Sequence, residues 1–198
     1  MGHRVAAVEL ADHNFEQLER NCRNIANVSV YKGDAVDLGR FGDGMFDTAL
    51  LLGPLYHLYE DGERRRAIEE AVRVTKRGGV IIAAFLSVHA IIYNNYLEGN
   101  LRAGIEENFT PDYGVRHFAE QCFTGYNVDE FEALFEDVGV THITTASADS
   151  ILEHAEGRTD FSMSDEEFSL FAKYHLQCCE KRELLGAASH LLYICRKS

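Results

Sequence analysis

Acidic side chains stand at the ends of two apolar runs, where a parallel sheet would place them beside a ligand. Glu9 lies near the end of the run 5–10, and Asp34 follows the shorter run 28–31. A carboxylate placed like Glu9 has the geometry to accept hydrogen bonds from ribose hydroxyls. The alternative is a loop carboxylate that contacts only water, and one acid at a strand end does not decide between the two.

Asp34 and Ala35 together suit the edge of an adenine ring. The carboxylate accepts a hydrogen bond from the exocyclic amine, while the backbone N–H of the following residue donates to a ring nitrogen. An Asx turn or a helix cap would use the same aspartate without any ligand. Both interpretations stay open at this position.

A third apolar run, 46–52, leads directly into the string Gly-Pro-Leu-Tyr-His-Leu. Gly53 lets the backbone approach a ligand closely, and Pro54 stiffens the chain after it. Tyr56 and His57 then present two polar aromatic side chains at the same edge. Three such strand ends in succession arise by chance far less often than any one of them.

The elements that would position these residues alternate along the chain. Apolar runs predict strands over 5–10, 28–31, 46–52, 80–85, 140–145 and 190–196. Helices are expected to begin at Asp12, Asp61, Asn127 and Ser164, and Glu130 and Glu167 complete capping boxes for the last two. Because the strands are too apolar to have a solvated face, the pattern predicts an α/β fold, a doubly wound and mostly parallel sheet.

Each predicted helix has a set of apolar residues, and we expect those of the second and third helices to point inward. These sets are Phe15, Leu18, Cys22 and Ile25; Ile68, Ala71, Val72 and Thr75; Phe131, Leu134, Phe135 and Val138; and Phe168, Phe171, His175 and Cys178. Lys76 and Arg77 would complement the C-terminal dipole of the second helix, and the glycine pair 78–79 would stop it.

Residues 1–198 are expected to form one domain with an insertion over 87–122. The insertion mixes aromatic and amide side chains without one clean period. It is either a lid that covers the substrate or a two-helix surface insertion that packs on the core. The pattern favours neither.

Charge and cysteine usage narrow the class of function. The chain has 19 Lys and Arg against 32 Asp and Glu, for a formal net charge of −13, which argues against a nucleic-acid partner or an anionic membrane surface. Its most apolar run is shorter than the ~20 residues of a membrane-spanning helix. Five cysteines without a CxxC pair predict a cytoplasmic protein with no metal site.

The strand ends, taken in order, resemble the class I S-adenosylmethionine-dependent methyltransferases. The stretches that carry the resemblance are Val8-Glu9-Leu10, Gly33-Asp34-Ala35, Phe46 to Leu58 and Arg73 to Gly79. Their order and spacing cover residues 5–85, and 126–196 agree more weakly. The resemblance implies a Rossmann-like sheet whose last two strands, 140–145 and 190–196, run antiparallel.

The resemblance also implies S-adenosylmethionine as the cofactor and assigns residues to it. Glu9 and Leu10 would lie at the ribose, and Asp34 and Ala35 at the adenine. Leu52, Gly53, Pro54 and Tyr56 would border the methionine end and the acceptor.

Methyl transfer can also require a side chain that takes a proton from the methyl acceptor. An oxygen or nitrogen acceptor loses a proton on methylation, and Tyr56, His57 or His117 could take it. The alternative is that these side chains, like most of the nine histidines, are ordinary surface or core residues.

One part of the family pattern, the first strand with its glycine-rich loop, has no counterpart in this sequence. We therefore expect an N-terminally truncated form that binds the cofactor weakly or not at all. The strands 5–10 and 46–52, which would flank the missing strand, could pair directly, or a second copy could fill the gap in a homo-oligomer.

The expected function is methyl transfer to a small-molecule substrate. A non-catalytic binding or oligomerisation module that keeps the fold is the alternative. A nicotinamide-dependent oxidoreductase would also use an acid such as Glu9, but the sequence has no GxGxxG.

Overall fold

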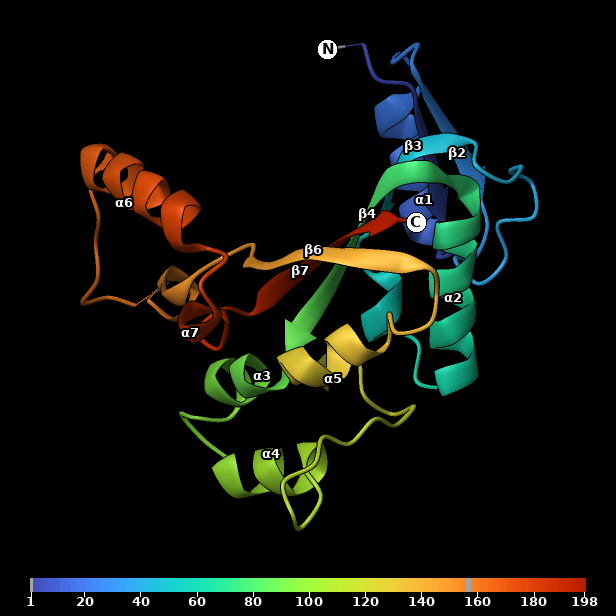
Figure 1. Cartoon of the computed structure of the whole chain (residues 1–198). Coiled ribbons are helices and arrows are strands. Elements are labelled where there is room, and N and C mark those ends of the chain that lie inside the picture. Colours follow the sequence, from blue (N-terminus) through green and yellow to red (C-terminus); the bar gives the residue numbers. More distant parts are fainter. Residues whose placement is uncertain (1, 156–157) are drawn as a thin grey trace.

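The computed structural model describes residues 2–155 and 158–198; Met1, Glu156 and Gly157 lie outside the described residues. Helices and strands alternate over most of this range (Figure 1). The elements are β1 (Val5–Glu9), α1 (Asp12–Cys22), β2 (Val28–Lys32), β3 (Phe46–Leu51), the short helix η1 (Pro54–Tyr56), α2 (Asp61–Val74), β4 (Thr75–Ser87), α3 (Val88–Asn95), α4 (Leu101–Asn108), β5 (Gly125–Tyr126), α5 (Val128–Ala133), β6 (Val140–Ser147), η2 (Ile151–His154), α6 (Asp165–Cys178), α7 (Arg182–Leu185) and β7 (His190–Lys197).

The strands form two sheets. β1 and β2 pair in parallel as a two-stranded sheet, and the other sheet has the order β3-β4-β7-β6, with β5 beside the end of β4. β3 and β5 run parallel to β4, whereas β7 runs antiparallel to both β4 and β6. The predicted α/β class and the antiparallel final pair are confirmed, while β5 was not predicted.

Within the described residues, no strand ladder joins β1 to β3. The expectation that these two strands pair directly is therefore wrong. Side chains connect the two sheets instead, because the ring of Phe41 lies 5.4 Å from that of Tyr31 on β2 and 5.2 Å from that of Phe46 on β3.

The core forms where α2 and α5 pack on the larger sheet. Ala67, Ile68 and Ala71 of α2 are buried in one apolar cluster with the β4 side chains. The ring of Phe131 on α5 stacks on Phe85 of β4 with centroids 4.0 Å apart. The second half of β4 is thereby mostly buried, whereas residues 76–78 near its start are exposed.

The predicted end of the second helix is wrong. α2 ends at Val74, and β4 begins at Thr75. Phe46 pairs with Thr75, but Thr48 pairs with Val80, so residues 76–79 form an irregularity inside the strand. The side chain of Thr75 is not in a helix face; its hydroxyl donates to the carbonyl of Ala71 at 2.7 Å.

The capping predictions were partly correct. The capping boxes that begin α5 and α6 are both present. Asp12 does not cap α1, because the N-cap residue is Ala11, whose N–H donates to a carboxylate oxygen of Glu9 at 2.8 Å. An acceptor two residues before the N-cap replaces the predicted cap.

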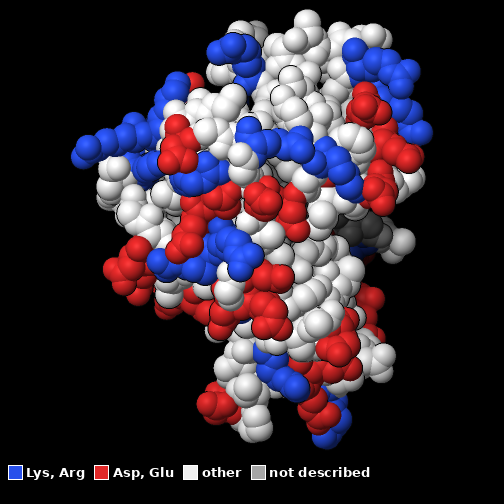
Figure 2. All heavy atoms as spheres, turned by 90° about the vertical axis from the view of Figure 1, so that its right-hand side faces the viewer, with Lys and Arg blue, Asp and Glu red and all other residues white. Residues whose placement is uncertain are grey.

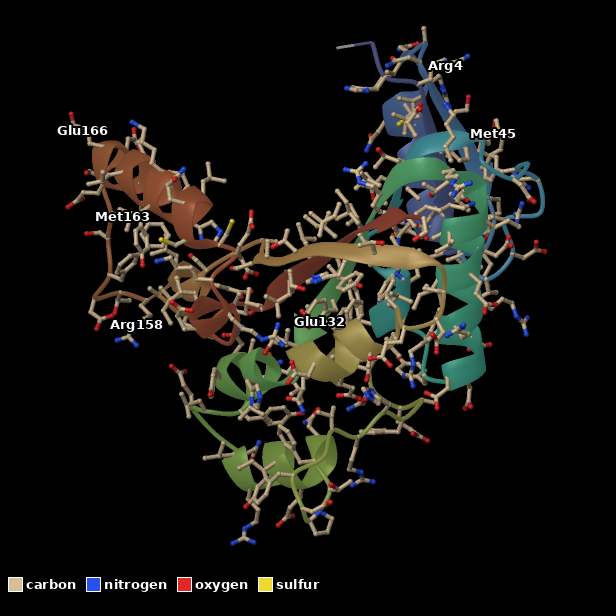
Figure 3. The ribbon with its side chains drawn as sticks, in the orientation of Figure 1. Arg4, Met45, Glu132, Arg158, Met163 and Glu166 are labelled. Atoms are coloured by element: carbon tan, nitrogen blue, oxygen red, sulfur yellow. The ribbon has the colours of Figure 1, made fainter. Side chains whose placement is uncertain are left out.

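The apolar residues of α6 are only partly covered, since Phe171, His175 and Cys178 are half-buried and Phe168 is exposed. The helix extends away from the sheet at one side of the molecule (Figure 1). Met163 comes just before it, and Glu166 lies in its first turn (Figure 3). None of its residues is buried, and Phe168 is 59% exposed. Its last turn is attached to β6, where the N–H of Ser147 donates to the carbonyl of Cys179 at 2.8 Å.

Acidic and basic side chains intermingle on the face shown in Figure 2, with no area given over to one sign. None of the described helices has both the length and the continuous apolar character that crossing a lipid bilayer requires.

Candidate functional site

The carboxyl ends of β1 and β2 lie side by side. Glu9 pairs with Lys32 in the ladder, and the N–H of Gly33 donates to the carbonyl of Glu9 at 3.1 Å. Asp34 follows at once, so the two predicted acids stand at one edge. Ala35 beside them packs partly against the core, while Leu10 is exposed.

Both carboxylates keep an oxygen for a ligand. One oxygen of Glu9 accepts from the N–H of Ala11, and Oδ1 of Asp34 accepts from the N–H of Val36 at 3.1 Å. The structure thus contains the Asx turn that the sequence left open at Asp34. Among the described residues, no donor contacts the second oxygen of either acid.

A hollow of about 300 Å³ opens beside Glu9. Asn14, Gln17, Leu18 and Asn21 of α1 line its other side. Amide and carboxylate groups that converge on a hollow suit a ligand with hydroxyl groups. Of the residues expected at the cofactor, Glu9 lines this hollow, whereas Asp34 and Ala35 do not.

The chain turns sharply after β3. Gly53 has φ of +146°, a backbone conformation that side-chain-bearing residues rarely adopt, and η1 begins at Pro54. Leu55 is fully buried and fixes the turn, while Leu52 before it is exposed. The buried hydroxyl of Tyr126 donates to the carbonyl of Leu55 at 2.8 Å.

The same turn is joined to the end of the insertion. The N–H of Thr124 donates to the carbonyl of Tyr56 at 2.9 Å, and Nδ1 of His57 lies 3.1 Å from the carbonyl oxygen of Cys122. The ring of Phe123 packs 5.9 Å from that of Tyr56. The turn and the insertion therefore hold one another in place.

The three proton-acceptor candidates differ in their surroundings. Burial raises the pKa of Tyr56 above its ordinary value, so at neutral pH its hydroxyl donates hydrogen bonds rather than accepting a proton. Both ring nitrogens of His117 are engaged, one by Thr124 and the other by Glu130 at 2.5 Å. His57 is exposed and keeps Nε2 unengaged among the described residues.

A larger cavity, of about 670 Å³, lies between the insertion and the end of β4. Tyr56 and Phe123 line one part of it, and the insertion supplies most of the remainder. Glu153 of η2 and His190 of β7 also line the cavity.

The sequence analysis did not identify these last two residues. Asp149, which follows β6, holds His190 through a contact of 2.8 Å between its Oδ2 and Nδ1. Only the antiparallel pairing of β6 and β7 brings positions 149 and 190 together, so no local spacing in the sequence signals them.

Comparison with known proteins identifies the family. A family model described as "Methyltransferase domain" matches residues 1–83, which include Glu9, Asp34 and Tyr56. The demethylmenaquinone methyltransferase of Paenarthrobacter aurescens (strain TC1) is 30% identical over 144 residues, which are 69% of this chain and 54% of that protein. These matches support a class I S-adenosylmethionine-dependent methyltransferase. It spans about half the length of that curated relative.

Solved structures of this methyltransferase family share the fold. A S-adenosylmethionine-dependent methyltransferase from Methanosarcina mazei aligns with a TM-score of 0.58 at 15% identity, over 99% of this chain and 82% of its own. A geranyl diphosphate methyltransferase, solved in complex with S-adenosylmethionine, aligns with a TM-score of 0.57 at 14% identity, over 100% of this chain and 70% of its own. S-adenosylmethionine is the cofactor of the family.

Proposed function

We propose that this chain serves the transfer of a methyl group from S-adenosylmethionine to a small molecule that binds in the 670 Å³ cavity. The observation that carries the proposal is the position of Tyr56. This residue ends the turn after β3 that the family places at the methionine end of the cofactor, and it lines the cavity as well. Cofactor and acceptor would therefore meet at this turn.

The adenosine part would lie across the ends of β1 and β2. Glu9 would accept hydrogen bonds from the ribose hydroxyls, and Asp34 with the N–H of Ala35 would contact the adenine. Leu52 and Gly53 would border the methionine end. These roles agree with the free carboxylate oxygens of both acids.

The bound cofactor supplies an electrophilic methyl group on a sulfonium sulfur. The chain's own residues then have to place an acceptor in line and exclude water. Tyr56 and Phe123 cover one side of the cavity, and the Tyr56 hydroxyl can donate a hydrogen bond to the acceptor. The insertion would act as the lid.

Glu9→Ala tests the cofactor site. We expect the binding free energy for S-adenosylmethionine to weaken by about 1–3 kcal/mol, because ribose hydroxyls lose their acceptor. In calorimetric titration the Kd would then rise roughly 5- to 150-fold. Glu16→Ala is the matched control, since Glu16 lies on the exposed side of α1. The same samples need urea unfolding curves, because Glu9 also binds the N–H of Ala11.

Unchanged affinity in Glu9→Ala would remove Glu9 from the site. A second candidate function, a binding or oligomerisation module without catalysis, is favoured by the separation of β1 from β3 among the described residues. Absence of measurable S-adenosylmethionine binding by the wild-type chain would support that module and contradict methyl transfer.

A further inference from the structure

The lining of the 670 Å³ cavity is acidic. Its charged residues are Glu107 and Glu120, from the insertion, and Glu153, from η2; no Lys or Arg belongs to the lining. None of these three glutamates forms an ion pair with a cationic side chain in the described part of the chain. A net negative lining attracts a cationic ligand and repels an anionic one.

Glu153 has the strongest need for a partner. It is partly buried, and its Oε2 is buried without a hydrogen bond from any described residue. By contrast, Glu107 is exposed and already accepts from the hydroxyl of Tyr96 at 3.3 Å. A buried carboxylate oxygen with no donor is costly. An ammonium group in the cavity would offset that cost by supplying N–H donors and charge together, once the Glu153 carboxylate turns its Oε2 toward the cavity.

His190 and Asp149 lie beside Glu153. Each of the three places one polar atom within 4.8 Å of the other two. Asp149 is held by the N–H groups of Ser189 and His190, each at 3.0 Å, and it accepts from Nδ1 of His190 at 2.8 Å. With the proton on Nδ1, the lone pair of His190 is on Nε2, which has no partner among the described residues.

The remaining lining is mixed: Asn94, Asn95, Asn108 and Gln121 supply amide groups, and another part suits an apolar body. Leu86, Ala90, Ile91, Phe118 and Phe123 supply aliphatic and aromatic surface around the same space. A ligand that satisfies both parts carries one amine on a hydrocarbon or aromatic frame.

We propose that the acceptor is a primary or secondary amine on an apolar or aromatic body, bound as its ammonium form beside Glu153, with His190 as the proton acceptor. This assignment rests on the proposed methyl transfer. Asp149 is a positioning residue, because it acts on the reaction only through the ring of His190.

The chemical step balances. The ammonium gives one proton to Nε2 of His190, and the freed nitrogen lone pair attacks the methyl carbon. An N–C bond forms while the C–S bond breaks, and its electron pair returns to sulfur as a neutral thioether. The positive charge then resides on the methylated ammonium and on His190, both facing the carboxylates of Glu153 and Asp149.

The test compares two ligands of the same shape on the full 198-residue chain. 2-Phenylethylamine is cationic at pH 7, whereas 2-phenylethanol has the same frame without charge. We expect NMR titration to show the amine binding at least about tenfold more tightly than the alcohol. Equal affinity of the two, or tighter binding of the alcohol, would overturn the proposal without requiring any variant.

Glu153→Gln locates the preference. We expect this substitution to reduce amine affinity about tenfold or more and to leave the alcohol unaffected. Glu166→Gln on the outlying helix α6 is the control, because Glu166 is exposed and lies far from the insertion (Figure 3). Equal losses in both variants, or no loss in Glu153→Gln, would contradict a carboxylate that binds the ammonium.

His190→Gln separates binding from proton transfer. Where the wild type methylates the amine, we expect kcat to fall by about 100-fold or more while the amine Kd stays within about threefold. An unchanged kcat would overturn the role of His190. Binding of both amine and S-adenosylmethionine without any methyl transfer would overturn the proposed function and leave the amine site standing.

Discussion

Arg73 holds the loop that lies between the two sheets. Its Nη1 donates to the carbonyl of Phe41 at 2.9 Å and to Asp43 at 2.8 Å, and its Nη2 donates to the carbonyl of Leu38 at 3.0 Å. Its Nε donates to Glu70 at 2.6 Å. The guanidinium therefore fastens to α2 the loop whose Phe41 connects the two sheets.

Arg73→Met should lower the free energy of unfolding by about 1–3 kcal/mol at pH 7, because two backbone carbonyls and two carboxylates lose their donor and the group is partly exposed. Urea unfolding measures the change, with Arg66→Met, an exposed position on the same helix, as the control. Equal effects at the two positions would show that the contacts of Arg73 contribute nothing particular.

The pH dependence of the same variant is a further part of this prediction. The hydrogen bond from Arg73 lowers the pKa of Glu70 below its ordinary value of 4.5. A lowered carboxylate pKa gives stability that is complete above pH 4.5 and is lost as pH falls through the folded-state value. The difference between wild type and Arg73→Met should therefore be smaller at pH 3 than at pH 7.

At the level of single residues, the sequence was enough to locate polar side chains that lie at the end of their own strand. Glu9 and Asp34 follow apolar runs directly, so the edge they share could be expected before any coordinates. Glu153 and His190 could not be found this way, because they approach one another only through the pairing of β6 with β7. The spacing of residues along the chain does not show which residues of two distant strands will pair.

At the level of elements, apolar runs predicted the strands well but not the start of β4. Lys76 and Arg77 read as a helix end because a glycine pair follows them. In the structure Gly78 takes φ of +76° and Gly79 lies against β3, so the glycines serve an irregularity in the strand instead. The same residues suit both uses, and only the pairing with β3 decides.

Gly79→Ala tests that irregularity. A Cβ at Gly79 would lie 2.8 Å from the carbonyl oxygen of Asp47 and 2.7 Å from a side-chain carbon of Thr75. We expect a loss of about 1–3 kcal/mol in unfolding free energy. Gly62→Ala on α2 meets nothing within 4 Å and should stabilise by up to about 1 kcal/mol. Similar effects of both substitutions would contradict close packing of residue 79.

Helix α6 shows a second case in which the sequence pattern predicted only part of the structure. Its capping box was predicted from Ser164 and Glu167, because caps depend on neighbours in sequence. How far its apolar residues are covered could not be predicted, since periodicity identifies an apolar stripe without saying what covers it. Phe168 and Leu176 are more than half exposed.

Over the whole molecule, burial is divided unequally between the two sheets. No residue from 2 to 40 is classed as buried, whereas β4 and β7 hold much of the core. The β1–α1–β2 unit is thus attached through partly buried contacts and the ring of Phe41. Few buried contacts predict a low free energy of local opening.

Native-state hydrogen exchange should resolve this division. We expect amides of β1 and β2 to exchange through an opening whose free energy is at least about 2 kcal/mol below that of the β4 amides 80–85. Saturation with S-adenosylmethionine should slow the β1 and β2 amides selectively, because the proposed site lies at their ends. Equal protection of both sheets without ligand would show that the molecule opens as a single unit.

The two-residue strand β5 has a consequence for how the molecule could diversify. Leu86 pairs with Gly125 and Ser87 with Tyr126, so the chain leaves the sheet at Ser87 and returns on the adjoining rungs. The segment from Val88 to Thr124 therefore starts and ends at neighbouring positions of the sheet. A segment of another length and composition could replace it without altering β1 and β2, and it would change which acceptor the proposed site prefers.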